Sequence, residues 1–131
     1  MATGPESSHA KYVLIVDDDV DAREVLGELI GALGHHPLQA SSAQEAVACA
    51  ERTRVDVALI DLGLPGADGY EVARRIRSTI AGNGIRLVAL TGYSDDLSRR
   101  SATEAGFDDF LVKPAATNDI AAAVNRDPAR S

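Results

Sequence analysis

The stretch VDVALIDLGLPGADG, residues 55–69, indicates the fold class of the chain. Residues 57–60 form a continuous run of aliphatic side chains, which is typical of a strand buried on both faces. The run ends at Asp61, and the glycines and proline that follow predict a turn-rich loop. A carboxylate at the carboxyl end of a buried strand lies where open α/β sheets bind their ligands. Asp61 is therefore the first candidate for a functional residue.

Four other apolar runs alternate with amphipathic segments on both sides of this stretch. The predicted strands cover Lys11–Val16, His36–Ala40, Val57–Ile60, Ile85–Leu90 and Asp109–Val112. The predicted helices cover Val20–Leu33, Ser42–Arg52, Tyr70–Thr79, a segment from Ser94 or Asp95 to Ala105, and Thr117–Asn125. Strands that are linked through helices by short loops pair in parallel, with right-handed crossovers. The sequence therefore predicts a single doubly wound α/β domain, (βα)5, with a five-stranded parallel sheet.

Helix starts and apolar stripes support this division of the chain. Asp19 or Asp21 is expected to cap the first helix, and residues 42–45 (SAQE) match a capping box. The expected inward-facing residues of the first helix are Ala22, Val25, Leu26, Leu29, Ile30 and Leu33. Those of the third helix are Val72, Ala73, Ile76 and Ile80.

Composition narrows the class of protein. The 131 residues carry a net charge of −7, which argues against a nucleic-acid or anionic-membrane partner. No apolar run approaches the roughly 20 residues that a membrane span needs. Cys49 is the only cysteine, so a reducing cytoplasm is the expected location. Residues 1–10 predict a disordered leader, residues 11–125 the domain, and residues 126–131 a frayed tail.

Polar residues follow four of the predicted strands at the point where each strand ends. They are Asp17 and Asp18 after the first, Asp61 after the third, Thr91 after the fourth and Lys113 after the fifth. Because the carboxyl ends of parallel strands share one edge of the sheet, these side chains should lie together. Three carboxylates against one ammonium would share protons or bind a cation, and oxygen ligands favour Mg²⁺. A carboxylate can also accept a phosphoryl group, whose charge a metal and a lysine would neutralise.

The chain resembles a response-regulator receiver domain, the phosphoacceptor module of bacterial two-component signalling, over residues 11–124. Four motifs carry the resemblance: VLIVDDD at 13–19, LIDLGLPGADGYEV at 59–72, LVALTG at 87–92 and GFDDFLVKP at 106–114. The resemblance implies a flavodoxin-like strand order of 2-1-3-4-5. The third and fourth motifs resemble those of receivers fused to hybrid histidine kinases, so a stand-alone receiver and a receiver excised from a larger protein are both expected origins.

The resemblance also implies a role for each site residue. Asp61 matches the phosphorylated aspartate, Asp17 and Asp18 the acidic pair that binds Mg²⁺, and Gly63 the position whose backbone carbonyl binds the metal. Thr91 matches the switch hydroxyl, Lys113 the phosphate-binding lysine, and Phe110 the aromatic switch position. The Lys113–Pro114 bond is expected to be cis.

The implied function is a signalling switch and not a turnover enzyme. A histidine kinase or histidine phosphotransfer protein would be the phosphoryl donor to Asp61, with Mg²⁺ present. The downstream target is open, and a monomer or weak dimer is expected. The competing hypothesis is a receiver-fold module for binding or dimerisation in which phosphorylation is incidental.

Other readings fit the residues less well. Asp17, Asp19, Asp21 and Glu28 match positions of a calcium-binding EF-hand loop, but Ala22 stands where the loop needs glycine. A flavin carrier would have a Ser/Thr/Gly-rich phosphate loop after the first strand. A haloacid-dehalogenase-type phosphatase would have an aspartate in place of Gly63. His35 and His36 could form a metal pair or a phosphohistidine, although solvent-exposed roles are expected.

Overall fold

The computed structural model describes residues 10–63, 69–92 and 95–126. The strands are β1 (Tyr12–Val16), β2 (His36–Ala40), β3 (Val57–Asp61), β4 (Arg86–Thr91) and β5 (Asp109–Val112). The helices are α1 (Val20–Ala32), α2 (Ala43–Arg52), α3 (Gly69–Arg77), α4 (Asp96–Ala105) and α5 (Thr117–Asn125), with a 3₁₀ turn, η1 (Gly82–Gly84), before β4. The predicted leader, most of the loop after Asp61, the positions 93–94 and the tail beyond residue 126 lie outside the described residues.

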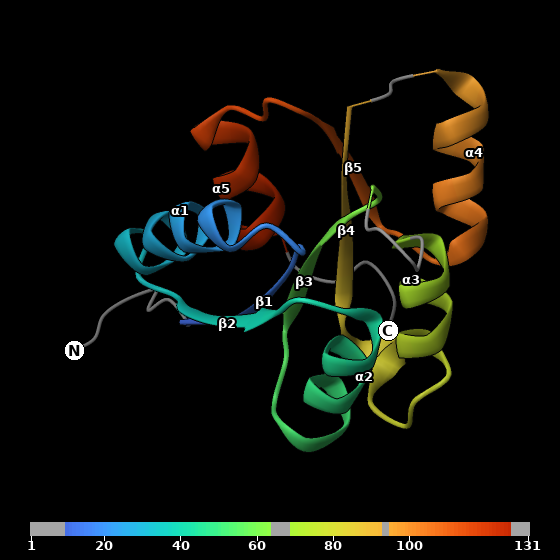
Figure 1. Cartoon of the computed structure of the whole chain (residues 1–131), viewed down its shortest axis with the longest axis horizontal. Coiled ribbons are helices and arrows are strands. Elements are labelled where there is room, and N and C mark those ends of the chain that lie inside the picture. Colours follow the sequence, from blue (N-terminus) through green and yellow to red (C-terminus); the bar gives the residue numbers. More distant parts are fainter. Residues whose placement is uncertain (1–9, 64–68, 93–94, 127–131) are drawn as a thin grey trace.

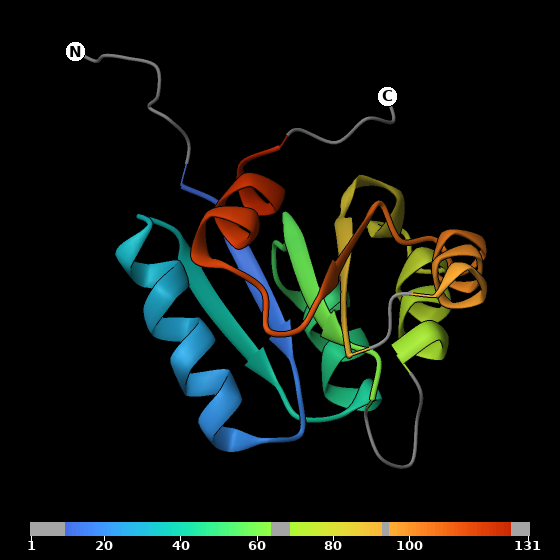
Figure 2. The same cartoon turned by 90° about the horizontal axis from the view of Figure 1, so that it is seen from above.

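The five strands form one parallel sheet in the order β2-β1-β3-β4-β5, so the predicted fold and strand order are confirmed. Helices α1 and α5 lie on one side of the sheet, and α2, α3 and α4 lie on the other (Figure 1). Figure 2 shows the same arrangement from above, with the sheet between its two helical layers. Both faces of the central strands are therefore covered, which explains their continuous apolar sequences.

Alternate residues of each central strand contribute to different cores. Leu14 and Val16 of β1 pack on the side of α2, α3 and α4. Val13 and Ile15 pack with residues of α1 and α5. All four are at most 1% exposed. The period of two along each strand thus supplies both layers from one short segment.

Helix starts follow the predicted capping, with one difference. Asp19 caps α1 by accepting a hydrogen bond from the amide of Asp21, and Ser42 caps α2 by accepting one from Glu45. The Glu45 carboxylate, however, accepts hydrogen bonds from the amide and hydroxyl of Ser41 and not from its cap residue. The acidic side chain therefore fixes the turn one residue earlier than a capping box would.

Two residues predicted to face inward are exposed. Val25 of α1 is 66% exposed because it lies on the flank of the stripe that contains the buried Ile30. Ile80 is fully exposed because α3 ends at Arg77, before the helical period could bring Ile80 to the buried side. The hydroxyl of Thr79 bonds to the carbonyl of Ile76 and so competes with continuation of the helix.

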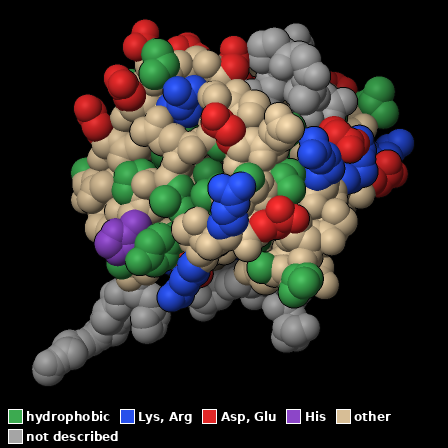
Figure 3. Space-filling view, turned by 60° about the horizontal axis from the view of Figure 1, so that its bottom comes forward, with side chains coloured by type: hydrophobic (Ala, Val, Ile, Leu, Met, Phe, Trp, Pro, Cys, Tyr) green, Lys and Arg blue, Asp and Glu red, His purple; other side chains and the backbone are tan. Residues whose placement is uncertain are grey.

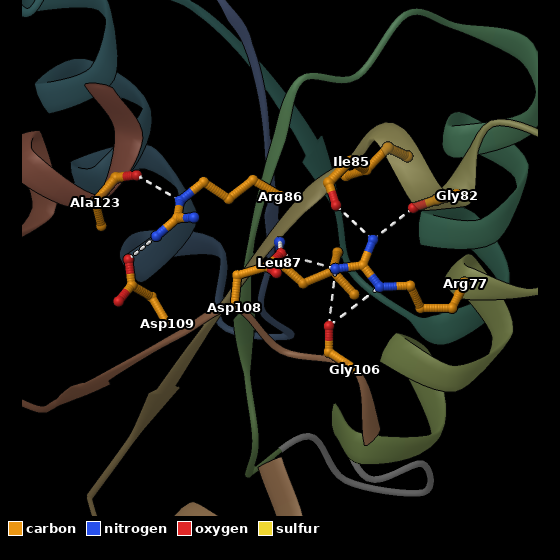
Figure 4. Close-up of polar contacts among 9 residues, drawn as sticks. All are labelled: Arg77, Gly82, Ile85, Arg86, Leu87, Gly106, Asp108, Asp109 and Ala123. Atoms are coloured by element: carbon orange, nitrogen blue, oxygen red, sulfur yellow. Dashed lines mark hydrogen bonds and ion pairs between the residues drawn. The ribbon is translucent and has the colours of Figure 1, made fainter. Parts of the chain in front are cut away.

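Two arginines connect neighbouring elements at the other end of the sheet, away from the strand ends that carry the polar residues. Arg86 of β4 is 2% exposed, donates to the carbonyl of Ala123 in α5 and pairs with Asp109 of β5 (Figure 4). Arg77 at the end of α3 donates to the carbonyls of Gly82, Ile85 and Gly106 and pairs with Asp108 (Figure 4). These buried ion pairs fix how α3, α5 and β5 meet β4.

Candidate functional site

The polar residues at the strand ends meet at one edge of the sheet. Asp61 is the last residue of β3 and Thr91 the last of β4, while Asp17 directly follows β1 and Lys113 directly follows β5. Backbone hydrogen bonds fix these ends: the Leu62 amide donates to Leu90, and the Lys113 amide donates to Thr91 at 2.7 Å. The parallel register therefore brings together residues that are up to 96 positions apart.

Asp61 contacts two donors through one oxygen. The ammonium Nζ of Lys113 lies 3.1 Å from Oδ1 of Asp61, and the amide of Gly63 donates to the same oxygen at 3.0 Å. The Asp61 side chain is 12% exposed and that of Lys113 is 43% exposed. The carboxylate is thus fixed by two donors, and it remains accessible from solvent.

Three carboxylates form a compact acidic group. Asp17, Asp18 and Asp61 each offer one oxygen, and these oxygens lie within 4.8 Å of one another. Asp17 is buried, whereas Asp18 is exposed. Burial raises the pKa of the Asp17 carboxyl, and the charges of Asp61 and Asp18 raise it further. The amide of Asp19 and the ammonium of Lys113 act in the opposite direction.

This donor set fits a hard divalent cation. Mg²⁺ is bound in proteins by one or two carboxylates with several waters retained, so an accessible group of three carboxylate oxygens suits it. A divalent ion would also relieve the repulsion that raises the pKa of Asp17. Of the predicted metal ligands, Asp17, Asp18 and Asp61 have carboxylate oxygens close to one another. His35 instead accepts from the amide of Lys11.

Thr91 and Phe110 lie on the neighbouring strands β4 and β5. Thr91 is 4% exposed and ends β4, so its side chain is largely covered at the edge of the site. Phe110 of β5 is half-buried, with the guanidinium of Arg99 4.8 Å from its ring centroid. The Lys113–Pro114 peptide bond is cis, the isomer that the resemblance implies.

Two residues at the site were not identified from the sequence. A Cβ on Gly69, the first residue of α3, would lie 2.8 Å from the backbone oxygen of Asp61, so only glycine fits there without a shift. Arg23 of α1 donates to the backbone carbonyl of Asp17 at 2.8 Å. Its position in the first turn of a predicted helix places it near the preceding loop, because helical side chains point toward the helix N-terminus, but the sequence does not show which group accepts from it.

The surroundings of the site are acidic on one side and apolar on another. On the face drawn in Figure 3, acidic side chains lie along the upper left margin and again at the right-hand edge, where basic side chains lie beside them. A groove runs from Asp17 and Lys113 between α1 and α5, with an apolar lining that includes Val25, Leu26 and Ile120. The EF-hand reading is excluded, since Asp21 and Glu28 lie within α1. Among the described residues, no helix combines the length and the apolar character that crossing a bilayer requires.

Comparison with known proteins identifies the family. The family model for the response regulator receiver domain matches residues 13–125. The chain belongs to the response regulator receiver domain family. An uncharacterized 14.6 kDa protein of Leptolyngbya boryana is 34% identical to this receiver domain over 102 residues, which is 78% of each chain. The transcriptional regulatory protein AruR of Pseudomonas aeruginosa is 36% identical over 109 residues, or 78% of this chain and 43% of AruR.

Solved structures agree with this assignment. The receiver domain of the sensor histidine kinase PA1611 from Pseudomonas aeruginosa, solved with a magnesium ion in its active site cleft, superposes with a TM-score of 0.83 at 29% identity. The match covers 93% of this chain and all of that one. The chemotaxis protein CheY4 of Vibrio cholerae has a TM-score of 0.86 at 24% identity over 91% of this chain and 99% of its own, which shows the shared fold.

The receiver domain spans less than half of several curated relatives, including 43% of AruR and 13% of a gliding motility regulatory protein of Myxococcus xanthus. Those relatives include regulators of transcription. The sequence-based expectation that nucleic acid is not a partner therefore remains a prediction. This prediction concerns the receiver domain alone. The boundaries of that domain, residues 11–125, are also a prediction.

Proposed function

We propose that this receiver domain is a phosphorylation switch in which Asp61 accepts a phosphoryl group from a phosphohistidine. The donor would be a histidine kinase or a histidine phosphotransfer protein, and Mg²⁺ would be required. The observation that carries the proposal is the placement of Asp61 within reach of both an acidic group and a single ammonium. The free cysteine, Cys49, is consistent with action in the cytoplasm.

The residues divide the chemistry between them. A carboxylate oxygen of Asp61 would bond to phosphorus as the phosphorus–nitrogen bond of the donor breaks, and the electron pair would leave with the imidazole. Asp17, Asp18, Asp61 and the backbone carbonyl of Gly63 would hold Mg²⁺. When bound, the metal supplies positive charge that offsets the negative charge of the phosphoryl oxygens. Lys113 would neutralise a further part of that charge.

The switch would involve Thr91 and Phe110. A phosphoryl oxygen on Asp61 would offer a new acceptor to the Thr91 hydroxyl at the end of the adjacent strand. Movement of Thr91 toward it would make room for the Phe110 ring. Phe110 lies on β5 opposite Ala89, two residues before Thr91 on β4, and its ring now lies under Arg99. The face formed by α4 and β5 is therefore the surface that we expect to change.

The donor would contact the face between α1 and α5. The groove there begins at Asp17 and Lys113 and has an apolar lining, so a bound segment would lie beside Lys113, which contacts Asp61. Val20 and Val25 of α1 are 50% and 66% exposed, which adds apolar surface next to Asp19 and Asp21. A partner with an apolar surface and basic residues near its phosphohistidine would complement this face.

One experiment separates the switch from a binding or dimerisation module. The chain is incubated with a small phosphodonor and Mg²⁺, and its intact mass is compared with that of Asp61→Ala. We expect the wild type to gain one phosphoryl group and the variant to gain none. A wild type that gains no mass supports the module, and a variant that gains the same mass excludes Asp61 as the acceptor.

A further inference from the structure

The turn that carries the two acidic residues is held by three hydrogen bonds around Asp17. Its amide donates to the carbonyl of Ala40 in β2 at 3.1 Å. Its carboxylate accepts from the amide of Asp19 at 3.0 Å. Its backbone carbonyl accepts from Nη1 of Arg23 at 2.8 Å. Asp17 is thus fixed at its amide, its side chain and its carbonyl by different groups.

Arg23 is the only one of these groups that acts through a long side chain. It lies in the first turn of α1, is half-buried, and its Nε also donates to the side-chain oxygen of Gln39 in β2 at 3.1 Å. One nitrogen of the rigid guanidinium group therefore donates to the loop after β1, and another donates to the edge strand β2. Both bonds constrain the direction of the guanidinium group.

We propose that Arg23 is a positioning residue for the metal site, acting through the peptide bond between Asp17 and Asp18. The peptide unit is planar, so a fixed carbonyl of Asp17 also fixes the Cα of Asp18. Asp18 is exposed and would otherwise be free to turn its carboxylate away from Asp17 and Asp61. This inference rests on the proposed function, because it assigns Arg23 to the same site.

Charge and geometry predict opposite effects of removing Arg23. If Arg23 acted only through its positive charge, its removal would strengthen the binding of a cation to three nearby carboxylates. If Arg23 holds the Asp17–Asp18 peptide, its removal weakens cation binding, because the two carboxylates lose their fixed spacing. The sign of the change in Mg²⁺ affinity therefore distinguishes the two roles.

The test is isothermal titration calorimetry of Mg²⁺ into the unphosphorylated protein at constant ionic strength. The variants are Arg23→Gln, Arg23→Lys and the control Arg75→Gln, which changes the net charge equally at an exposed position on α3. Thermal unfolding of each variant is measured beside it. Loss of an outer-shell partner of a ligand commonly weakens metal binding 10- to 100-fold.

We expect Arg23→Gln to weaken Mg²⁺ binding about 10-fold relative to Arg75→Gln. Arg23→Lys should lose less, because lysine keeps one donor but not the guanidinium group. Affinity in Arg23→Gln equal to or above that of Arg75→Gln would overturn the inference. Should Arg23→Gln fail to fold, wild-type affinity in Arg23→Lys would overturn it. A wild type that binds no Mg²⁺ would contradict the proposed function instead.

Discussion

The ammonium of Lys113 lies 3.1 Å from Oδ1 of Asp61, on the oxygen that also accepts from the amide of Gly63. This contact joins the end of β5 to the end of β3 across the intervening β4. A phosphoryl group on Asp61 would move the negative charge outward from the carboxylate. Lys113 would then have to follow that charge, and the segment after β5 would move with it.

Lys113→Ala should therefore separate phosphoryl uptake from the response to it. Phosphoryl uptake from a small phosphodonor, followed by intact mass, should largely persist, because Asp61 and the acidic group remain. The change at Phe110, followed by NMR of Phe-labelled protein, should be lost. The protein contains only two phenylalanines, so its signals are easily assigned.

The same variant has a predicted effect on the metal. Removal of an ammonium beside the carboxylates should tighten Mg²⁺ binding, because the positive charge of Lys113 repels a divalent cation at the acidic group. Equal loss of uptake and of the Phe110 response would contradict a coupling role for Lys113.

Asp17→Asn should stabilise the metal-free protein. Burial and the neighbouring carboxylates raise the pKa of Asp17, so its ionised form is unfavourable in the folded state. A carboxyl whose folded-state pKa is raised supplies stability at low pH that is lost as pH rises through that pKa. The asparagine variant removes this loss, and we expect its free energy of unfolding in urea at neutral pH to exceed that of the wild type.

The pH dependence provides the control for Asp17. The difference in unfolding free energy between Asp17→Asn and the wild type should shrink as pH falls below the raised pKa. A difference that is constant with pH would show that the ionisation of Asp17 is not its cause. Mg²⁺ binding by the variant should be weaker at all pH values, since one carboxylate ligand is gone.

Gly69→Ala should destabilise the protein and displace Asp61. The added Cβ would lie 2.8 Å from the backbone oxygen of Asp61 and from Cα of Leu62, and backbone atoms cannot yield as a flexible side chain can. A loss of roughly 1–3 kcal/mol is expected in urea unfolding. The matched control is Gly31→Ala in α1, where a Cβ meets nothing within 4 Å. That variant should gain roughly 0.5–1 kcal/mol from helix propensity. Similar effects of the two substitutions would rule out the close approach as the cause.

Arg99→Ala should release the Phe110 ring from its present position. The guanidinium of Arg99 lies 4.8 Å from the ring centroid, a cation–π contact worth about 0.5–1 kcal/mol at an exposed site. Its loss should increase the population with the ring turned inward before any phosphorylation, seen as a shift of the Phe110 NMR signals. Arg100→Ala, on an exposed turn of the same helix, should leave those signals unchanged. Equal spectra for wild type and Arg99→Ala would show that Arg99 does not hold the ring.

The fold was predictable because the strands and helices of this sheet each have a recognisable pattern of apolar residues in the sequence. Buried parallel strands such as Val57–Ile60 are continuous apolar runs, and polar residues after four strands mark one edge of the sheet. Helix ends were less predictable, since they depend on local competition for hydrogen bonds. Ile80 fits the period of α3, but the Thr79 hydroxyl bonds to the carbonyl of Ile76 and α3 ends at Arg77.

Contacts made by long polar side chains could not be predicted from the pattern. Arg86 interrupts an apolar strand, yet it is buried because Asp109 and the carbonyl of Ala123 accept from it. Arg23 was hidden in the same way, because its acceptor is a backbone carbonyl and not a residue type that a motif would show. The carboxylates and Lys113 were found from strand ends, since backbone topology alone brings them together.

The acidic group and Lys113, which surround the end of β3, are expected to direct a phosphoryl group to Asp61. The most direct measurement is borohydride reduction after incubation with phosphodonor and Mg²⁺, which converts an aspartyl phosphate to homoserine that peptide mass spectrometry can locate. We predict homoserine at position 61 alone, and none when Mg²⁺ is removed by chelation. Homoserine at Asp17 or Asp18, or none at all in a protein that binds Mg²⁺, would contradict the account.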